Sequence, residues 1–190
     1  VTRTVIVGKA TADMKRHFTL VLKGMIAVSQ ARFPLGTTGV QIDSLARAAL
    51  WEHGFDFDHG TGHGVGSYLS VHEGPARISK AGHVALEPGM ILSNEPGYYL
   101  KGKYGIRIEN LLLVMPPQKP KGGDRAMLSF ETLTFSPIDR NLIDDTIMTR
   151  SEIQWLDQYH ANVLRKLSSK VAKKTKPWLE SVCAPLTRKS

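Results

Sequence analysis

The sequence is poor in cysteine and has no long apolar stretch. Its single cysteine, Cys183, allows no internal disulfide, which is typical of proteins in a reducing compartment. No uninterrupted apolar run reaches the roughly 20 residues of a membrane-spanning helix. The first residues also lack the charged start and long apolar centre of a signal peptide. We therefore expect a cytoplasmic protein that has no membrane partner.

The chain has no initiator methionine, and Val1 opens a segment, Thr2–Gly8, whose alternating β-branched residues predict a strand. We expect that sequence upstream of Val1 has been removed. Apolar residues make up 42% of the 190 residues, enough for one sizeable core. The composition therefore predicts a folded protein and not a disordered one.

The positive charge lies mainly at the C-terminal end. Residues 150–190 contain nine Lys or Arg and three acidic residues, so they carry +6 of the net charge of +8. No aromatic residues interleave with these cations as they do in single-strand binders. A solvated helical face explains the charge better than a polyanion site does, so nucleic acid is not an expected partner.

Two helices and a long β region are expected before residue 148. Thr11 caps a helix that continues to about Arg32, Phe33–Gly39 forms a loop, and a second helix ends near Gly54. The following residues favour strands, including Met90–Asn94, Ile106–Met115 and Ala126–Phe135. The last two flank a Pro- and Gly-rich turn and predict an antiparallel hairpin.

A final helix begins after Thr149, which forms a capping box with Glu152. Together with a short segment around Trp178 it forms a C-terminal helical extension. We predict an α+β fold with two parts, residues 1–148 and residues 149–190.

Three histidines fall within the stretch DHGTGHGVGSYLSVHEGP: His59, His63 and His72. Glycines alternate with the other residues from 60 to 66, which predicts close approach of a ligand or of another backbone. His59 and His63 are four residues apart and would share one face of a strand. This grouping favours a functional role over a structural one.

Two carboxylates lie in apolar surroundings, Glu95 in ILSNEPGYY and Glu109 in GIRIENLLLV. A carboxylate in such a strand is expected to be paired or metal-bound, because burying it alone is costly. For Glu109 a salt bridge to Arg107 is the lesser alternative. One imidazole and two carboxylates suit manganese or cobalt, or zinc if the geometry dictates.

In this order, HGTGHGVG, VHEGP, LEPGMILSNEPGYY, GIRIEN and FETLT resemble the metal-binding half of the Xaa-Pro aminopeptidases (aminopeptidase P). These enzymes belong to the creatinase/methionine aminopeptidase group with the pita-bread fold. The spacing of His63 and His72 and the closing helix resemble the long form. The resemblance implies only the second half of the fold, followed by a helical appendage.

The resemblance implies two divalent cations, usually manganese, that share a hydroxide. This hydroxide attacks the bond before a proline at position two of the peptide. His63 and Glu95 correspond to ligands of one cation and Glu109 to the carboxylate that bridges both. His59 and His72 correspond to the histidines that contact the substrate and stabilise the intermediate. Glu95 would also handle a proton, and Arg107 would orient a metal-bound acid.

The family's site also needs two aspartates and a histidine that have no counterpart in this chain. The chain is therefore expected to be an incomplete, inactive fragment that binds at most one metal ion, weakly. We also expect an exposed apolar face and association through the C-terminal region, as a homodimer. The alternatives are a non-catalytic pita-bread module that binds peptides or histones, and a prolidase that cleaves dipeptides.

Overall fold

The computed structural model describes residues 1–68 and 70–186 and has an α+β architecture. Its helices are α1 (Ala12–Ser29), α2 (Gly39–Trp51), α3 (Arg150–Leu167) and α4 (Lys176–Val182), with 3-10 turns at Arg140–Leu142, Asp145–Ile147 and Lys173–Thr175. Its strands are β1 (Arg32–Pro34), β2 (Gly62–Val65), β3 (His72–Ile78), β4 (Ile91–Asn94), β5 (Gly97–Leu100), β6 (Tyr104–Arg107), β7 (Asn110–Gln118) and β8 (Met127–Thr132).

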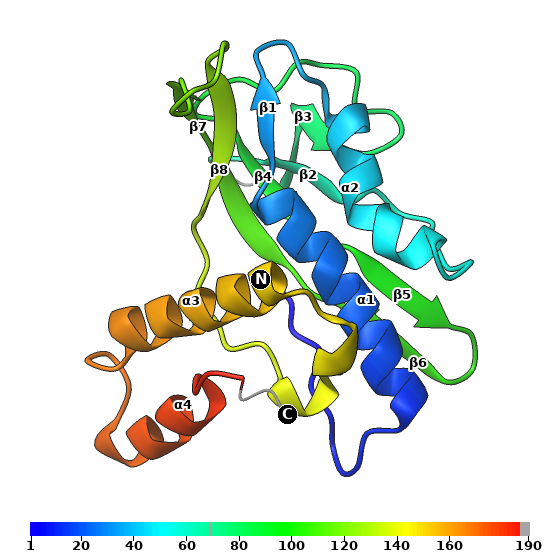
Figure 1. The fold of residues 1–190 in the computed structure, drawn as a ribbon, viewed down its shortest axis with the longest axis vertical. Helices are drawn as coiled ribbons and strands as arrows, with labels where there is room; N and C mark the ends of the chain where they lie inside the picture. Colours follow the sequence, from blue (N-terminus) through cyan, green and yellow to red (C-terminus); the bar gives the residue numbers. More distant parts are fainter. Residues whose placement is uncertain (69, 187–190) are drawn as a thin grey trace.

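The strands form two antiparallel sheets. The larger sheet has the order β1-β8-β7-β4-β2-β3, and β5 pairs with β6 in the smaller one. Figure 1 shows α1 running across the strands with α2 beside it, whereas α3 and α4 lie at the other end of the molecule from α2. The predicted hairpin is confirmed, since β7 pairs with β8.

The N-terminal caps of α1 and α3 were predicted correctly. The Thr11 hydroxyl accepts a hydrogen bond from the Met14 N–H, and α3 begins with the expected capping box of Thr149 and Glu152. The structure differs from the prediction at the end of α1, which stops at Ser29. The next residues leave the helix because Phe33, 3% exposed, packs on Phe130 while Arg32–Pro34 pairs with the edge of β8. The predicted loop therefore starts as a strand, and an edge position tolerates its proline.

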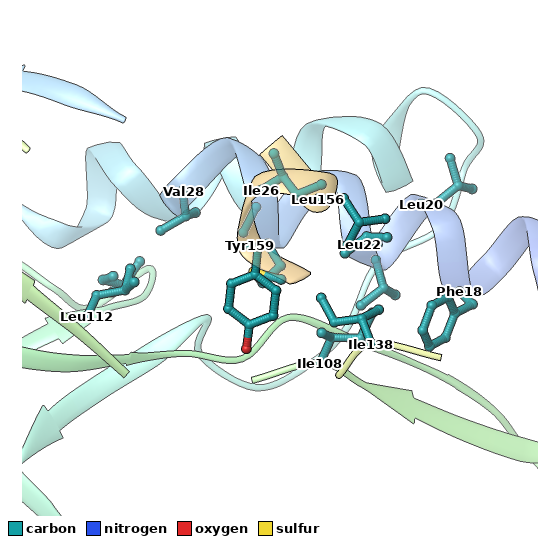
Figure 2. Packing of buried hydrophobic residues seen from close by; sticks show 14 of the residues in the cluster. Phe18, Leu20, Leu22, Ile26, Val28, Ile108, Leu112, Ile138, Leu156 and Tyr159 are labelled. Atoms are coloured by element: carbon teal, nitrogen blue, oxygen red, sulfur yellow. The ribbon is translucent and has the colours of Figure 1, made fainter. Parts of the chain in front are cut away.

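One core joins the helices to the larger sheet. Buried side chains of α1 pack against strand residues such as Leu112 and against Leu156 and Tyr159 of α3, as Figure 2 shows. Leu156 and Val163 of α3 are 0% exposed. Helix α3 thus shares this core. The predicted division of the chain into residues 1–148 and 149–190 stays a prediction. Residues 187–190 of the predicted extension lie outside the described residues.

The predicted strand Thr2–Gly8 is wrong: in the described chain this segment makes one isolated bridge, between Thr2 and Glu109. Side chains replace backbone pairing beyond that bridge. The Thr4 hydroxyl donates to the carbonyl of Arg107 and accepts from its N–H, at 3.1 and 3.0 Å. Val5 and Val7 are 64% and 94% exposed. The segment therefore lies along the strands without extending the ladder.

The predicted strand Ile106–Met115 is interrupted. β6 ends at Arg107 and β7 begins at Asn110, so residues 108 and 109 connect the two sheets. On the neighbouring chain segment Glu95 and Pro96 connect β4 to β5. The two connections run side by side, because the Ile108 N–H donates to the Pro96 carbonyl at 3.3 Å. Both candidate glutamates therefore lie where the sheets meet.

In the described part of the chain, no helix combines the length and apolar character needed to cross a membrane.

Candidate metal-binding site

The glycines around His63 allow backbones to approach each other. A Cβ atom on Gly62 would lie 1.8 Å from the Ser93 carbonyl oxygen, and one on Gly64 would lie 2.1 Å from that of Glu73. Any larger residue would require these strands to separate. The close approach predicted from the sequence is therefore to neighbouring backbone, and it lets β2 lie between β3 and β4.

His63 and Glu95 form the central pair of the site. The His63 Nε2 atom lies 3.3 Å from the Glu95 Oε1 atom, and the two side chains are 20% and 13% exposed. The Ser93 hydroxyl donates to the same Oε1 atom at 2.8 Å and accepts from the His63 N–H at 3.0 Å. One strand residue thus connects the two candidate ligands.

The His63–Glu95 pair fits a divalent cation. His63 Nδ1 lies 2.8 Å from the Gly64 carbonyl oxygen, an acceptor, so Nε2 is the ring nitrogen directed at Glu95. An imidazole nitrogen and a carboxylate oxygen thus face each other at 3.3 Å. A positive charge between them stabilises such a pair, and imidazole nitrogen with carboxylate oxygen suits manganese, cobalt or zinc.

His72 lies beside His63 at the rim of a hollow. Their ring centroids are 3.9 Å apart, because β3 pairs with β2 around a register shift. The hollow has a volume of about 340 Å³ and is also lined by Glu73 and Arg77 of β3. His63 and His72, both candidates from the sequence, therefore lie side by side and line this hollow.

His59 lies outside β2 and has different neighbours from His63. It precedes the strand in a bend, and its Nε2 atom lies 2.9 Å from the Tyr99 hydroxyl. The expectation that His59 and His63 share one strand face is therefore wrong. Side chains of α2 contact this segment: Arg47 donates to the His59 carbonyl, and Asp43 accepts from the Thr61 hydroxyl.

Tyr99 connects His59 to Arg107. Arg107 Nε donates to the Tyr99 hydroxyl at 2.8 Å, and Arg107 Nη1 lies 3.6 Å from Glu95 Oε2. His59 Nδ1 lies 2.7 Å from the Gly60 carbonyl, which leaves Nε2 as the ring nitrogen at the Tyr99 hydroxyl. A continuous set of contacts therefore runs from His59 to Glu95.

Arg47 holds the segment that carries His59. Its guanidinium, on a side chain 2% exposed, pairs with Asp43 at 2.8 Å and with Asp56 at 2.7 Å, and donates to the His59 carbonyl at 2.8 Å. Burial opposes the charged form, but the hydrogen bonds to both aspartates leave the pKa of Arg47 raised. The Thr61 hydroxyl donates to Asp43 at 2.7 Å. The Arg47 guanidinium therefore stays charged.

Glu109 has separate partners. The Thr2 hydroxyl donates to Glu109 Oε2, and the amino group of Val1 lies 3.7 Å from the same atom. The alternative of an ion pair between Glu109 and Arg107 is not the arrangement found, because Arg107 pairs with Glu95. Among residues 1–68 and 70–186, no three His, Cys, Asp or Glu side chains are grouped closely enough for a metal ion. Of the three predicted metal ligands, His63 and Glu95 contact each other, and Glu109 does not join them.

Sequence reasoning did not assign a role to Ser93, Tyr99 or Arg47. Ser93 and Tyr99 stand in the motif that carries Glu95, but nothing in the pattern showed that their hydroxyls contact the candidate residues. Arg47 lies in a helix, where a cation is ordinarily solvated. Its burial depends on Asp43 one turn earlier and on Asp56 beyond the helix.

The fold and these motifs are those of a known peptidase family. Residues 1–116 match metallopeptidase family M24, and residues 126–186 match the C-terminal region of peptidase M24. The chain therefore belongs to metallopeptidase family M24. The predicted α+β, pita-bread fold class is confirmed.

The curated relatives include two fungal proteins called probable Xaa-Pro aminopeptidase P. That of Sclerotinia sclerotiorum is 49% identical, over 97% of this chain and 32% of the relative. That of Laccaria bicolor is 48% identical, over 98% of this chain and 30% of the relative. The chain thus spans about a third of the length of the curated relatives it matches, and the resemblance to Xaa-Pro aminopeptidases is confirmed.

Solved structures give the same picture. The X-prolyl aminopeptidase of Caenorhabditis elegans, described as a cytosolic enzyme with a di-nuclear active site, has a TM-score of 0.90 and is 41% identical, over 97% of this chain and 31% of that chain. The prolidase of Pyrococcus furiosus has a TM-score of 0.58 and is 32% identical, over 70% of this chain and 36% of that chain.

Proposed function

We propose that this chain supplies part of the active site of a metal-dependent aminopeptidase. The enzyme releases the N-terminal residue from peptides with proline at position two. The observation that carries the proposal is the contact of His63 Nε2 with Glu95 Oε1 at 3.3 Å, which brings two of the candidate metal ligands together. The similarity to Xaa-Pro aminopeptidases over nearly the whole chain supports this substrate class.

In this proposal His63, Glu95 and Glu109 hold divalent metal, with manganese preferred and cobalt or zinc possible. When bound, the metal supplies Lewis acidity and lowers the pKa of a coordinated water. The Glu109 Oε2 atom accepts from the Thr2 hydroxyl, which would orient the carboxylate for this role. Glu95, whose side chain is 13% exposed, also takes up and returns a proton during peptide cleavage.

His59 and His72 contact the peptide. His72 lies at the rim of the hollow beside His63, where an imidazole donor can offset negative charge on the reacting carbonyl. His59 is oriented by Tyr99 and by its contact with the Gly60 carbonyl. Arg107 fixes Glu95 from the other side through Oε2.

The proposal assigns this chain only part of the site, because its relatives are about three times as long. By itself the chain is expected to bind at most one manganese ion, weakly, and to hydrolyse no peptide. The complete enzyme would act in the cytoplasm, and the C-terminal region would form a homodimer interface.

Aminopeptidase activity is favoured over dipeptidase activity. The relatives that match nearly the whole chain support this choice: the two fungal proteins are called probable Xaa-Pro aminopeptidase P, and the structure with a TM-score of 0.90 is an X-prolyl aminopeptidase. A binding module without metal is less favoured, because His63 contacts both Glu95 and His72.

The proposal is tested by assaying a protein that contains this chain, with manganese added. Tripeptides with proline at position two should lose their first residue, whereas matched tripeptides with alanine there should not. His63→Ala should lower kcat/KM at least 100-fold, and His53→Ala, which changes an exposed histidine, should not. Cleavage restricted to Xaa-Pro dipeptides, or an unaffected His63→Ala variant, would contradict the proposal.

A further inference from the structure

Ser93 lies in the middle of β4, and its side chain contacts both members of the central pair. The residue is 0% exposed. Its hydroxyl accepts from the His63 N–H at 3.0 Å and donates to Glu95 Oε1 at 2.8 Å. No other described hydroxyl contacts both of these residues by hydrogen bonds.

The two hydrogen bonds give the hydroxyl a fixed direction. A serine hydroxyl has one proton, so its only donor bond goes to Glu95. The backbone of Ser93 is held as well, because the residue is paired with Leu111 and its carbonyl lies against Gly62. The Ser93 hydroxyl therefore fixes the position of Glu95 Oε1 relative to the backbone of β2, which carries His63.

The two oxygens of the Glu95 carboxylate therefore have different partners. Oε1 receives the Ser93 hydroxyl and faces His63, while Oε2 faces Arg107 Nη1 at 3.6 Å. Without the hydroxyl, the Glu95 side chain could rotate about its Cα–Cβ and Cβ–Cγ bonds and move Oε1 away from His63. With the hydroxyl, Oε1 is held toward His63 Nε2.

We propose that Ser93 is a positioning residue that sets the separation and orientation of His63 and Glu95 for a divalent cation. The inference rests on the proposed function, because it concerns the same site. Ser93 itself donates its only proton to Glu95 and touches no metal. Its effect on metal affinity is therefore exerted through the carboxylate.

If Ser93 only stabilised the fold, removal of another buried hydroxyl should weaken manganese binding equally. Thr19 provides this matched control. Thr19 is also 0% exposed, and its hydroxyl donates to the Lys15 carbonyl at 2.8 Å and accepts from the Asp144 N–H at 2.9 Å. Thr19→Val thus removes a buried hydroxyl with two similar bonds, outside the site.

The test titrates the purified chain with manganese chloride and follows free Mn²⁺ by electron paramagnetic resonance. Ser93→Ala should weaken binding about 10- to 100-fold, the loss typical when a hydrogen-bond partner of a metal ligand is removed. Ser93→Thr should restore affinity, and Thr19→Val should leave it unchanged. If Ser93→Ala does not fold, Ser93→Cys replaces it, since a thiol is a weaker donor.

Unchanged affinity in folded Ser93→Ala, or equal weakening in Thr19→Val, would overturn the inference. A metal-free measurement separates this result from failure of the proposed function. Three-bond NMR couplings of Glu95 should report one rotamer in the wild type and averaging in Ser93→Ala. A wild type that binds no manganese contradicts the His63–Glu95 cation site, and unaltered couplings in Ser93→Ala overturn the positioning role.

Discussion

At the scale of single residues, Arg47 connects helix α2 to the segment that carries His59. Its guanidinium contacts Asp43, Asp56 and the carbonyls of Phe57 and His59. The cation also lies 3.9 Å from the centroid of the Phe57 ring, which in turn packs on His59. The orientation of a candidate catalytic histidine thus depends on a buried ion pair.

Replacing Arg47 with methionine should destabilise the fold by about 3–5 kcal/mol, because Asp43 would be left buried without its partner. Urea unfolding measures this loss. Arg165→Met is the control, since Arg165 is exposed and donates to the amide oxygen of Asn162, and its effect should stay within about 0.5 kcal/mol. Equal unfolding midpoints for Arg47→Met and the wild type would show that the ion pair does not support the fold.

The residues of the site show what the sequence could and could not provide. His63, Glu95 and Arg107 could be selected from their motifs, and the structure brings them into contact. Their supports, Ser93 and Tyr99, could not be selected. The reason is physical: a hydroxyl gains a role only from the partner that the fold places within hydrogen-bond distance.

At the scale of elements, helix α3 carries a buried histidine. His160 is 0% exposed, accepts from the Ile138 N–H at 3.0 Å, and has no partner for Nδ1 among the described residues. Burial, together with the positive charges of Arg140 and Arg3, lowers its pKa from 6.5 to about 4. The ring is therefore neutral in the folded protein at neutral pH.

This shift makes the stability of the fold depend on pH. Between pH 6.5 and about 4 the unfolded chain binds a proton at His160 that the folded chain does not. Stability present above pH 6.5 is thus lost as the pH falls, by about 3 kcal/mol in all. Urea unfolding at pH 7 and pH 4 should show a smaller loss in His160→Gln than in the wild type.

The exposed His53 supplies the control for this experiment. His53→Gln should lose as much stability as the wild type over the same pH range, because carboxylate titration is common to all three proteins. If His160→Gln and the wild type lose equal stability, His160 is not the titrating group.

The sequence predicted helices and strands well where residues close together in the chain determine the structure. The cap at Thr11 and the capping box at Thr149 determine where helices start, and both were read correctly. Strand β1 and the break at residues 108–109 were missed, because each depends on a distant neighbour. β1 exists only by pairing with β8, and the break occurs where Ile108 contacts Pro96.

At the scale of the whole molecule, the candidate site lies between two sheets. Glu95 and Glu109 lie on the two connections between the larger and smaller sheets, and His63 reaches Glu95 from the adjacent strand β2. Backbone registers on both sides of the connections hold these residues in place. The order of motifs along the sequence indicated the family, whereas this junction could be seen only in the fold.

The central claim is that His63 and Glu95 form a cation site within this chain. Calorimetric titration with Mn²⁺ tests it most directly, on the wild type and on His63→Ala, with His53→Ala as the matched control. We predict one weak site in the wild type and His53→Ala, and none in His63→Ala. Two tight sites, or binding that survives His63→Ala, would contradict the account.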